Sequence, residues 1–146
     1  MRITYKGDYA LKIILDLARH FSNTPVNIRD IAKRADIPVK FSEQILLELK
    51  RGGFVQSKRG KIGGYRLSRP PSQIKLGDVV RFIDGPIEPI ACLRRGYVGC
   101  NDIKVCFFRG IWQQVANSIS KIIDNITFEE LVKKADKIGS SITYQI

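Results

Sequence analysis

Three cysteines are the residues of this chain whose type and spacing most clearly indicate chemistry. Cys92, Cys100 and Cys106 lie within fifteen consecutive residues, and the sequence contains no other cysteine. Three thiols cannot all pair within one chain, so metal or redox chemistry is the first interpretation. Seven and five residues separate them, whereas most structural zinc sites use spacings of roughly two to four. Thiolates also hold iron–sulfur clusters, which usually take about four protein ligands, so this loop would need one ligand from elsewhere.

The residues around the cysteines favour the thiolate form, because Arg94, Arg95 and Lys104 lie among them and nearby cations stabilise thiolates. The alternative is three reduced thiols that serve only packing. His20 is the only histidine, and no motif links it to a nucleophile and an orienting acid, so Ser-His-Asp or Cys-His catalysis is not expected. We interpret His20 as a structural residue near the end of a helix, and we predict that the chain is not an enzyme.

The elements that must position these residues begin with three helices. Apolar residues recur at intervals of three and four from Asp8 to Phe21, which predicts an amphipathic helix with Phe21 on its inner face. Asn27 is a typical N-cap for a second helix over 28–35. A third helix is predicted over 39–51. Its inner face is expected to carry Phe41, Ile45 and Leu49, and its outer face Lys40, Glu43, Gln44, Leu47 and Lys50.

Two short strands, 54–57 and 65–67, flank a glycine-rich basic loop and predict a hairpin. Three helices followed by such a hairpin form a winged helix-turn-helix, whose third helix enters the major groove of DNA. Between Lys50 and Arg69 the sequence has seven basic residues and no acidic one, which favours nucleic-acid contact over a merely solvated hairpin. We expect base contacts from the third helix and phosphate or minor-groove contacts from the hairpin. The candidates are Lys40, Glu43 and Gln44 for bases, and Lys58, Arg59 and Lys61 for phosphates.

The second half of the chain is predicted to contain a fourth helix that ends at Gly85, a loop over 87–106, and a long helix. The long helix repeats apolar residues from Phe108 to Ile126 at intervals close to a heptad, more apolar surface than one chain of this size covers, so we expect a homodimer. Thr127 to Glu130 has the form of a capping box that starts a final short helix through Leu131 and Ala135. The predicted fold is mainly α with a β-hairpin wing, with residues 1–70 as the DNA-binding part and residues 71–146 carrying the cysteine loop and the dimerisation helices.

Charge supports a polyanionic partner. The chain of 146 residues carries a net charge of +11, and residues 1–70, with 15 basic and 6 acidic side chains, account for +9. Such an excess is typical of proteins that bind nucleic acid. No membrane-spanning run and no signal-peptide core occur, so we expect a cytoplasmic protein with no membrane partner.

These residues resemble the Rrf-type family of bacterial winged-helix regulators. The resemblance rests on the stretch from Gly63 through Pro70-Pro71 to Gly85, and on residues 6–10. It implies that Cys92, Cys100 and Cys106 are ligands of an iron–sulfur cluster and that the long helix forms the dimer. The four-iron four-sulfur type is favoured over the two-iron two-sulfur type.

The fourth ligand distinguishes two branches of that family. IscR-like members carry a histidine three residues after the third cysteine, where this chain has Arg109. NsrR-like members use an aspartate early in the first helix, donated across the dimer, and Asp8 stands at that place. The other interpretation of Asp8 is a carboxylate that stabilises a helix N-terminus, and the two are compatible.

The resemblance therefore implies a dimeric repressor that binds double-stranded DNA at a near-palindromic operator. Its cluster would sense nitric oxide, redox state or iron–sulfur supply, with no small-molecule substrate. Two alternatives remain. One is a cluster-free regulator of the same fold, of the CymR type, controlled by a protein partner. The other is a zinc or thiol-redox protein without specific DNA binding.

Overall fold

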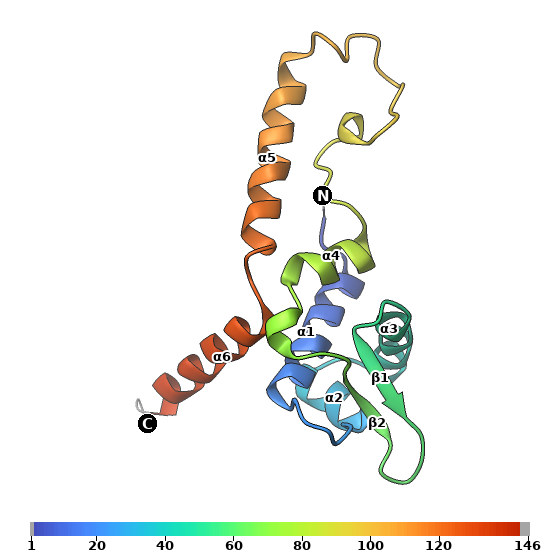
Figure 1. Cartoon of the computed structure of the whole chain (residues 1–146), viewed down its shortest axis with the longest axis vertical. Coiled ribbons are helices and arrows are strands. Elements are labelled where there is room, and N and C mark those ends of the chain that lie inside the picture. Colours follow the sequence, from blue (N-terminus) through green and yellow to red (C-terminus); the bar gives the residue numbers. More distant parts are fainter. Residues whose placement is uncertain (1, 144–146) are drawn as a thin grey trace.

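In a computed structural model, which describes residues 2–143, the chain forms six α-helices and one two-stranded antiparallel sheet within that range (Figure 1). Two short 3-10 helices, η1 and η2, lie on either side of α4. The elements run in the order α1 Tyr5–Arg19, α2 Ile28–Ala35, α3 Val39–Arg51, β1 Val55–Lys58, β2 Gly64–Leu67, η1 Pro71–Gln73, α4 Leu76–Asp84, η2 Ala91–Leu93, α5 Phe107–Ile123 and α6 Phe128–Thr143.

The helix boundaries follow local capping chemistry. Asn27 caps α2 by accepting a hydrogen bond from the Arg29 backbone N–H at 2.8 Å, as predicted. The first helix starts at Tyr5 rather than at Asp8, because the Thr4 hydroxyl accepts from the Gly7 N–H at 3.0 Å and caps an earlier turn. That helix ends at Arg19, so the prediction that Phe21 lies on its inner face is wrong. Phe21 lies beyond the helix and is 46% exposed.

The inner face of α3 is also shifted from the predicted one. Ile45 and Leu49 are buried as expected, but Phe41 is 54% exposed, and the buried positions next to them are Ser42 and Leu46. The Ser42 side chain fits there because its hydroxyl donates to the carbonyl of Pro38. Phe41 instead lies at the edge of the core, where its ring packs at a tilt against a tyrosine of α1.

One hydrophobic core joins the first three helices and the hairpin to parts of the second half. Ile13, Leu46 and Val55 come from the first part of the chain, and Val79 and Phe128 come from α4 and α6. Phe128 is the largest of the fully buried side chains in this core. The core therefore continues past residue 70, and the division at residue 70 remains a prediction about function.

The last two helices project from this core (Figure 1). The predicted capping box is present, since the Thr127 N–H donates to the Glu130 carboxylate and the Glu130 N–H donates to the Thr127 hydroxyl. The helix that it starts is not short, because α6 runs to Thr143. No proline or glycine cluster stops it near Ala135. No helix in the described part of the chain has the length and apolarity that crossing a membrane requires.

Candidate nucleic-acid interface and cysteine loop

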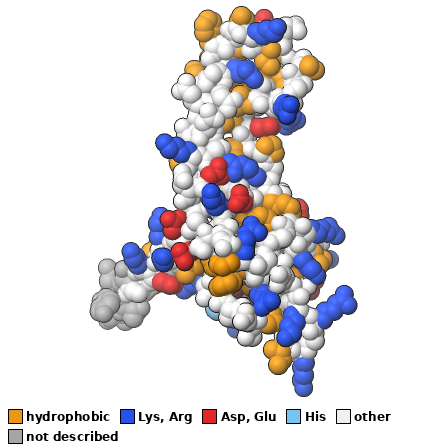
Figure 2. Space-filling view, in the orientation of Figure 1, with side chains coloured by type: hydrophobic (Ala, Val, Ile, Leu, Met, Phe, Trp, Pro, Cys, Tyr) orange, Lys and Arg blue, Asp and Glu red, His pale blue; other side chains and the backbone are white. Residues whose placement is uncertain are grey.

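The predicted DNA-contacting side chains all lie on the surface. Lys40, Glu43 and Gln44 are exposed on α3, and the basic residues of the loop between β1 and β2 are exposed around the hairpin tip. Figure 2 shows Lys and Arg side chains gathered around this hairpin, with Asp and Glu visible mainly near the middle of the molecule. The Lys50 ammonium donates to the Ser57 hydroxyl at 2.6 Å and so links the end of α3 to the wing. The arrangement suits contact with a polyanion over two adjoining elements.

The wing is attached to the start of α2 as well as to α3. Val26 and Tyr65 exchange two backbone hydrogen bonds, of 2.7 and 2.8 Å, which continue the β1–β2 sheet by one isolated bridge. Gly64 makes this approach possible. Its φ is +154°, and a Cβ there would lie 2.1 Å from the Val26 carbonyl oxygen. The Arg66 guanidinium adds a bond to the Asn23 carbonyl at 3.2 Å. The position of the wing relative to α2 is therefore fixed by backbone contacts.

A partly buried ion pair holds α2 against α1. The Asp16 carboxylate is 9% exposed and accepts from both Nε and a terminal nitrogen of Arg34, at 2.8 and 2.9 Å. This two-point hydrogen bonding raises the pKa of Arg34 above its ordinary value. His20 lies beside this ion pair, with its Nδ1 2.8 Å from the carbonyl oxygen of Asp16. These contacts fit the structural role predicted for His20.

The cysteine loop leaves α4 and returns as α5, and it lies at the end of the molecule away from the wing (Figure 1). All three cysteines are free; Cys100 is exposed, and Cys92 and Cys106 are half-buried. The Arg109 guanidinium donates to the Cys92 carbonyl at 3.4 Å, which joins the first turn of α5 to the loop. Cys106 immediately precedes α5 as its N-cap residue, so the third cysteine lies where the loop joins this helix.

The donor set fits an iron–sulfur cluster in its chemistry. Three unpaired thiols on one loop, with arginines nearby, are the ligand type that cluster iron prefers. Within residues 2–143 no three His, Cys, Asp or Glu side chains stand together as a metal site. Within one chain, therefore, the described structure does not bring the three cysteines and Asp8 together into one metal site.

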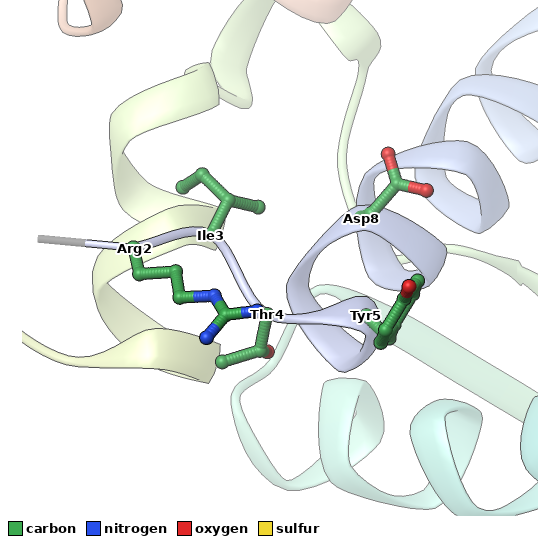
Figure 3. Close-up of a pocket in the computed structure, with 5 residues that line it drawn as sticks. All are labelled: Arg2, Ile3, Thr4, Tyr5 and Asp8. Carbon is green, nitrogen blue, oxygen red and sulfur yellow. The ribbon is translucent and has the colours of Figure 1, made fainter.

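Asp8 lies in the first turn of α1 and pairs with Lys12, the distance between carboxylate and ammonium being 2.9 Å. The hydrogen bond to Asp8 raises the pKa of Lys12. Half of the Asp8 side chain is exposed, and it borders a surface hollow of about 560 Å³ beside Thr4 and Tyr5 (Figure 3). The carboxylate is accessible from outside the chain, as a ligand donated to another subunit must be.

A contact that the sequence did not reveal lies next to this hollow. The Asp84 carboxylate, at the end of α4, accepts hydrogen bonds from the backbone N–H and the hydroxyl of Thr4. Eighty residues separate the two positions, and no local pattern marks either as half of a pair. The only signal in the sequence for this contact is Gly7, because glycine is a poor helix former and no local feature explains its place in the first turn of α1.

Comparison with known proteins shows the family to which this chain belongs. The model of the Rrf2 family, described as an iron-dependent transcriptional regulator, matches residues 3–134. The chain belongs to the Rrf2 family. A protein of Rhodobacter capsulatus named as an rrf2-like HTH-type transcriptional regulator is 39% identical over 137 residues, which cover 89% of this chain and 91% of that protein. The HTH-type transcriptional regulator IscR of Yersinia pseudotuberculosis is 36% identical over 136 residues, covering 93% of this chain and 82% of that one.

Solved structures of Rrf2 regulators share the fold. CymR, the global cysteine regulator of B. subtilis, matches with a TM-score of 0.76 and 29% identity over 92% of this chain and 98% of that one. IscR of T. potens matches with a TM-score of 0.74 and 30% identity over 94% and 90%. The predicted family and the predicted winged-helix fold are confirmed, and the chain is an HTH-type transcriptional regulator that binds DNA.

Proposed function

We propose that this Rrf2 regulator acts in the cytoplasm as a homodimeric repressor that binds a near-palindromic operator through α3 and the wing. The observation that supports DNA contact at these two elements is the stretch over 50–69, which has seven basic residues and no acidic one, exposes its hairpin tip, and is fixed to α2 and α3. Two copies related by a two-fold axis present two identical reading helices, which is why the operator should be a near-palindrome.

The long helix α5 supports the homodimer. Its apolar side chains are largely exposed, from 91% for Phe107 and 68% for Phe108 to 55% for Ile111, and Ala116 is its only buried residue within the described chain. In soluble proteins an exposed row of apolar side chains along one helix, here called the α5 seam, is covered by a partner. A second copy of α5 is the simplest cover, because the seam repeats at nearly heptad intervals. Sedimentation at micromolar concentration should give the mass of a dimer, and Ile111→Asp should shift it to a monomer.

We further propose that Cys92, Cys100 and Cys106 hold an iron–sulfur cluster, with Asp8 of the partner subunit as the fourth ligand. When bound, the cluster supplies iron that reacts with nitric oxide or oxygen and exchanges electrons. The protein's part is to hold the thiolates at a loop between the core and α5. Arg109 secures one side of this loop at Cys92, so a change in ligation can alter how α5 meets the core and how far apart the two α3 helices stand.

Anaerobic purification followed by iron and acid-labile sulfide analysis tests this proposal. We expect iron and sulfide in equal amounts, near four of each per chain for the four-iron type. Cys100→Ala should lose both. Asp8→Ala should keep the cluster but change its lifetime or its response to nitric oxide, because a carboxylate is a weaker ligand than a thiolate. Asp30→Ala is the matched control, since Asp30 is also an exposed carboxylate in the first turn of a helix.

A cluster-free regulator is the second candidate, favoured by the CymR structure, 98% of which is covered by the match. In that case a protein partner would control DNA affinity, and the cysteines would be incidental. Colourless, iron-free protein with three titratable thiols and unchanged operator binding in Cys100→Ala would support this candidate. Zinc bound to the cysteines, without preference for any DNA site, would instead support a zinc or thiol-redox protein.

A further inference from the structure

Asp84 links the end of α4 to the beginning of α1. Its Oδ2 accepts from the Thr4 N–H at 3.0 Å, and its Oδ1 accepts from the Thr4 hydroxyl at 2.5 Å. The same hydroxyl accepts from the Gly7 N–H, so one carboxylate and one threonine satisfy the first turn of α1 together. Gly7 leaves room for this, because a Cβ there would lie 2.1 Å from Asp84 Oδ2. The carboxylate also lies at the positive end of the α1 dipole.

Asp84 stands where the cysteine loop leaves the core. It is the last residue of α4, and Gly85 follows with a φ of +89°, which turns the chain away from the helix. Pro86 cannot continue a helix, and Ile87 is buried at 8% exposure, so the chain between Asp84 and the loop is short and packed against the core. A movement of the loop base would therefore act on Asp84 directly.

The first turns of α1 contact the recognition helix as well. The Lys6 ammonium lies 2.7 Å from the Glu48 carboxylate on α3. Tyr9 packs its ring against Phe41, with the ring centroids 6.5 Å apart. Lys6 follows Thr4 by two residues, and Tyr9 lies one turn further. A shift of the start of α1 therefore changes contacts with both halves of α3.

We propose that Asp84 is a positioning residue that couples the base of the cysteine loop to the recognition helix through the first turn of α1. When the loop base moves, Asp84 moves Thr4 and Gly7, and α3 follows through its contacts with Lys6 and Tyr9. The inference rests on the proposed function in one respect, namely that the state of the loop controls operator binding. Asp84 itself touches neither DNA nor any cysteine ligand in this scheme.

A residue that merely caps α1 would have a different signature. Loss of a cap weakens the helix that it caps and leaves distant elements alone. A positioning residue also changes α3, and its removal reduces the response of DNA binding to the loop while basal binding remains. Three quantities therefore need separate measurements: the stability of the contact between Asp84 and α1, the protection of α3 against amide exchange, and the change in operator affinity when the loop changes state.

The contact itself is tested by a double-mutant cycle of Gly7→Ala and Asp84→Ala in urea unfolding. All three atoms that crowd an added Cβ at Gly7 belong to the Asp84 side chain beyond its own Cβ, so Asp84→Ala removes them. We expect Gly7→Ala to lower the unfolding constant in the Asp84→Ala background, by about two- to fivefold, because alanine is the better helix former. In the wild-type background the same change should raise the unfolding constant. Equal effects in both backgrounds would overturn the proposed contact.

Amide hydrogen exchange of the cluster-free protein then tests the connection to α3. Asp84→Ala should increase exchange in α3 by at least about threefold, in the range of known effects on coupling between sites. In Asp84→Asn the exchange of α3 should lie between that of wild type and that of Asp84→Ala, because the amide oxygen can still accept one hydrogen bond from Thr4. Asp78→Ala is the matched control, an exposed carboxylate on the same helix. Increases confined to the first turn of α1 would show that Asp84 is only a cap.

Operator binding separates failure of this inference from failure of the proposed function. Affinity for a DNA site selected from a random pool is measured for cluster-loaded and cluster-stripped protein. The response is the ratio of the affinities with and without the cluster. If wild type shows such a change in affinity and the change is at least about threefold smaller in Asp84→Ala, the coupling is supported. An equal response in both proteins would overturn the role of Asp84 and leave the proposed function standing. No response in wild type would overturn the proposed function, and with it the coupling to the loop, while the exchange measurement still decides the contact with α3.

Discussion

Replacing Gly64 with alanine should detach the wing from α2 without altering any side chain that faces DNA. The added Cβ would lie 2.1 Å from the Val26 carbonyl oxygen and 2.5 Å from its carbon, both backbone atoms that cannot turn aside. The two hydrogen bonds between Val26 and Tyr65 would break, each contributing about 1 kcal/mol. The positive φ adds about 1 kcal/mol of strain. The free energy of unfolding should therefore fall by about 3 kcal/mol.

Urea unfolding measures this loss, which should lower the midpoint by about 1 to 2 M at an unchanged slope. Most domains of this size are stable enough to remain folded after such a loss, so DNA binding can be measured on the same protein. Affinity should fall about five- to tenfold, because the basic hairpin is no longer held in its binding orientation. Gly139→Ala is the control, since no described atom outside its chain neighbours and the nearby backbone of its own helix lies within 4 Å of the added Cβ. A stability and an affinity both equal to those of wild type would refute the proposed attachment.

Three further changes test other parts of the interface and core. Arg59→Ala should weaken binding to every DNA sequence and reduce the slope of log affinity against log salt by about 0.9 for each phosphate that the protein no longer neutralises, as a salt titration would show; an unchanged slope would remove Arg59 from the phosphate-binding residues. Glu43→Ala should instead change the preferred sequence in a selection from random DNA, and an unaltered preference would exclude base reading by Glu43. Arg81 lowers the pKa of Asp124 through a hydrogen bond of 2.6 Å, so the folded state favours the charged carboxylate. Asp124→Asn should therefore cost less than about 1 kcal/mol at neutral pH, since the pair is more than one-third exposed. The cost should begin to shrink as the pH falls below about 4 and disappear once the pH is below the lowered pKa of Asp124; a cost that does not decrease between pH 7 and pH 2 would contradict this.

The sequence predicted the elements that local chemistry determines. Asn27 and the capping box at Thr127 both act within a few residues, and the structure has each of them where the local pattern placed it. The errors arose where tertiary packing decided. Phe41 matched a spacing of four, but the core faces a slightly different stripe of α3, and Phe21 matched the apolar pattern beyond the last helical residue.

The candidate site was predicted less completely than the fold. The sequence placed the basic candidates on the outer face of the third helix and in the hairpin loop, and the structure exposes them there. The contact between Asp84 and Thr4 did not, since it joins residues 80 positions apart. The sequence placed Gly64 in the glycine-rich loop of the hairpin, whereas in the structure Gly64 begins β2 and lies in close contact with Val26. Side chains that act across the fold, or across a dimer as proposed for Asp8, leave no local pattern.

The most direct test of the account is operator affinity of one anaerobic preparation, measured before and after its iron is removed with a chelator. Wild type should contain iron and sulfide, and its affinity should change by about tenfold or more on iron removal, within the usual range of coupling between two sites. Cys100→Ala should bind with the affinity of the iron-free protein under both conditions. Iron-free wild type with three reduced thiols, whose operator affinity equals that of Cys100→Ala throughout, would contradict the claim that the cysteine loop controls DNA binding.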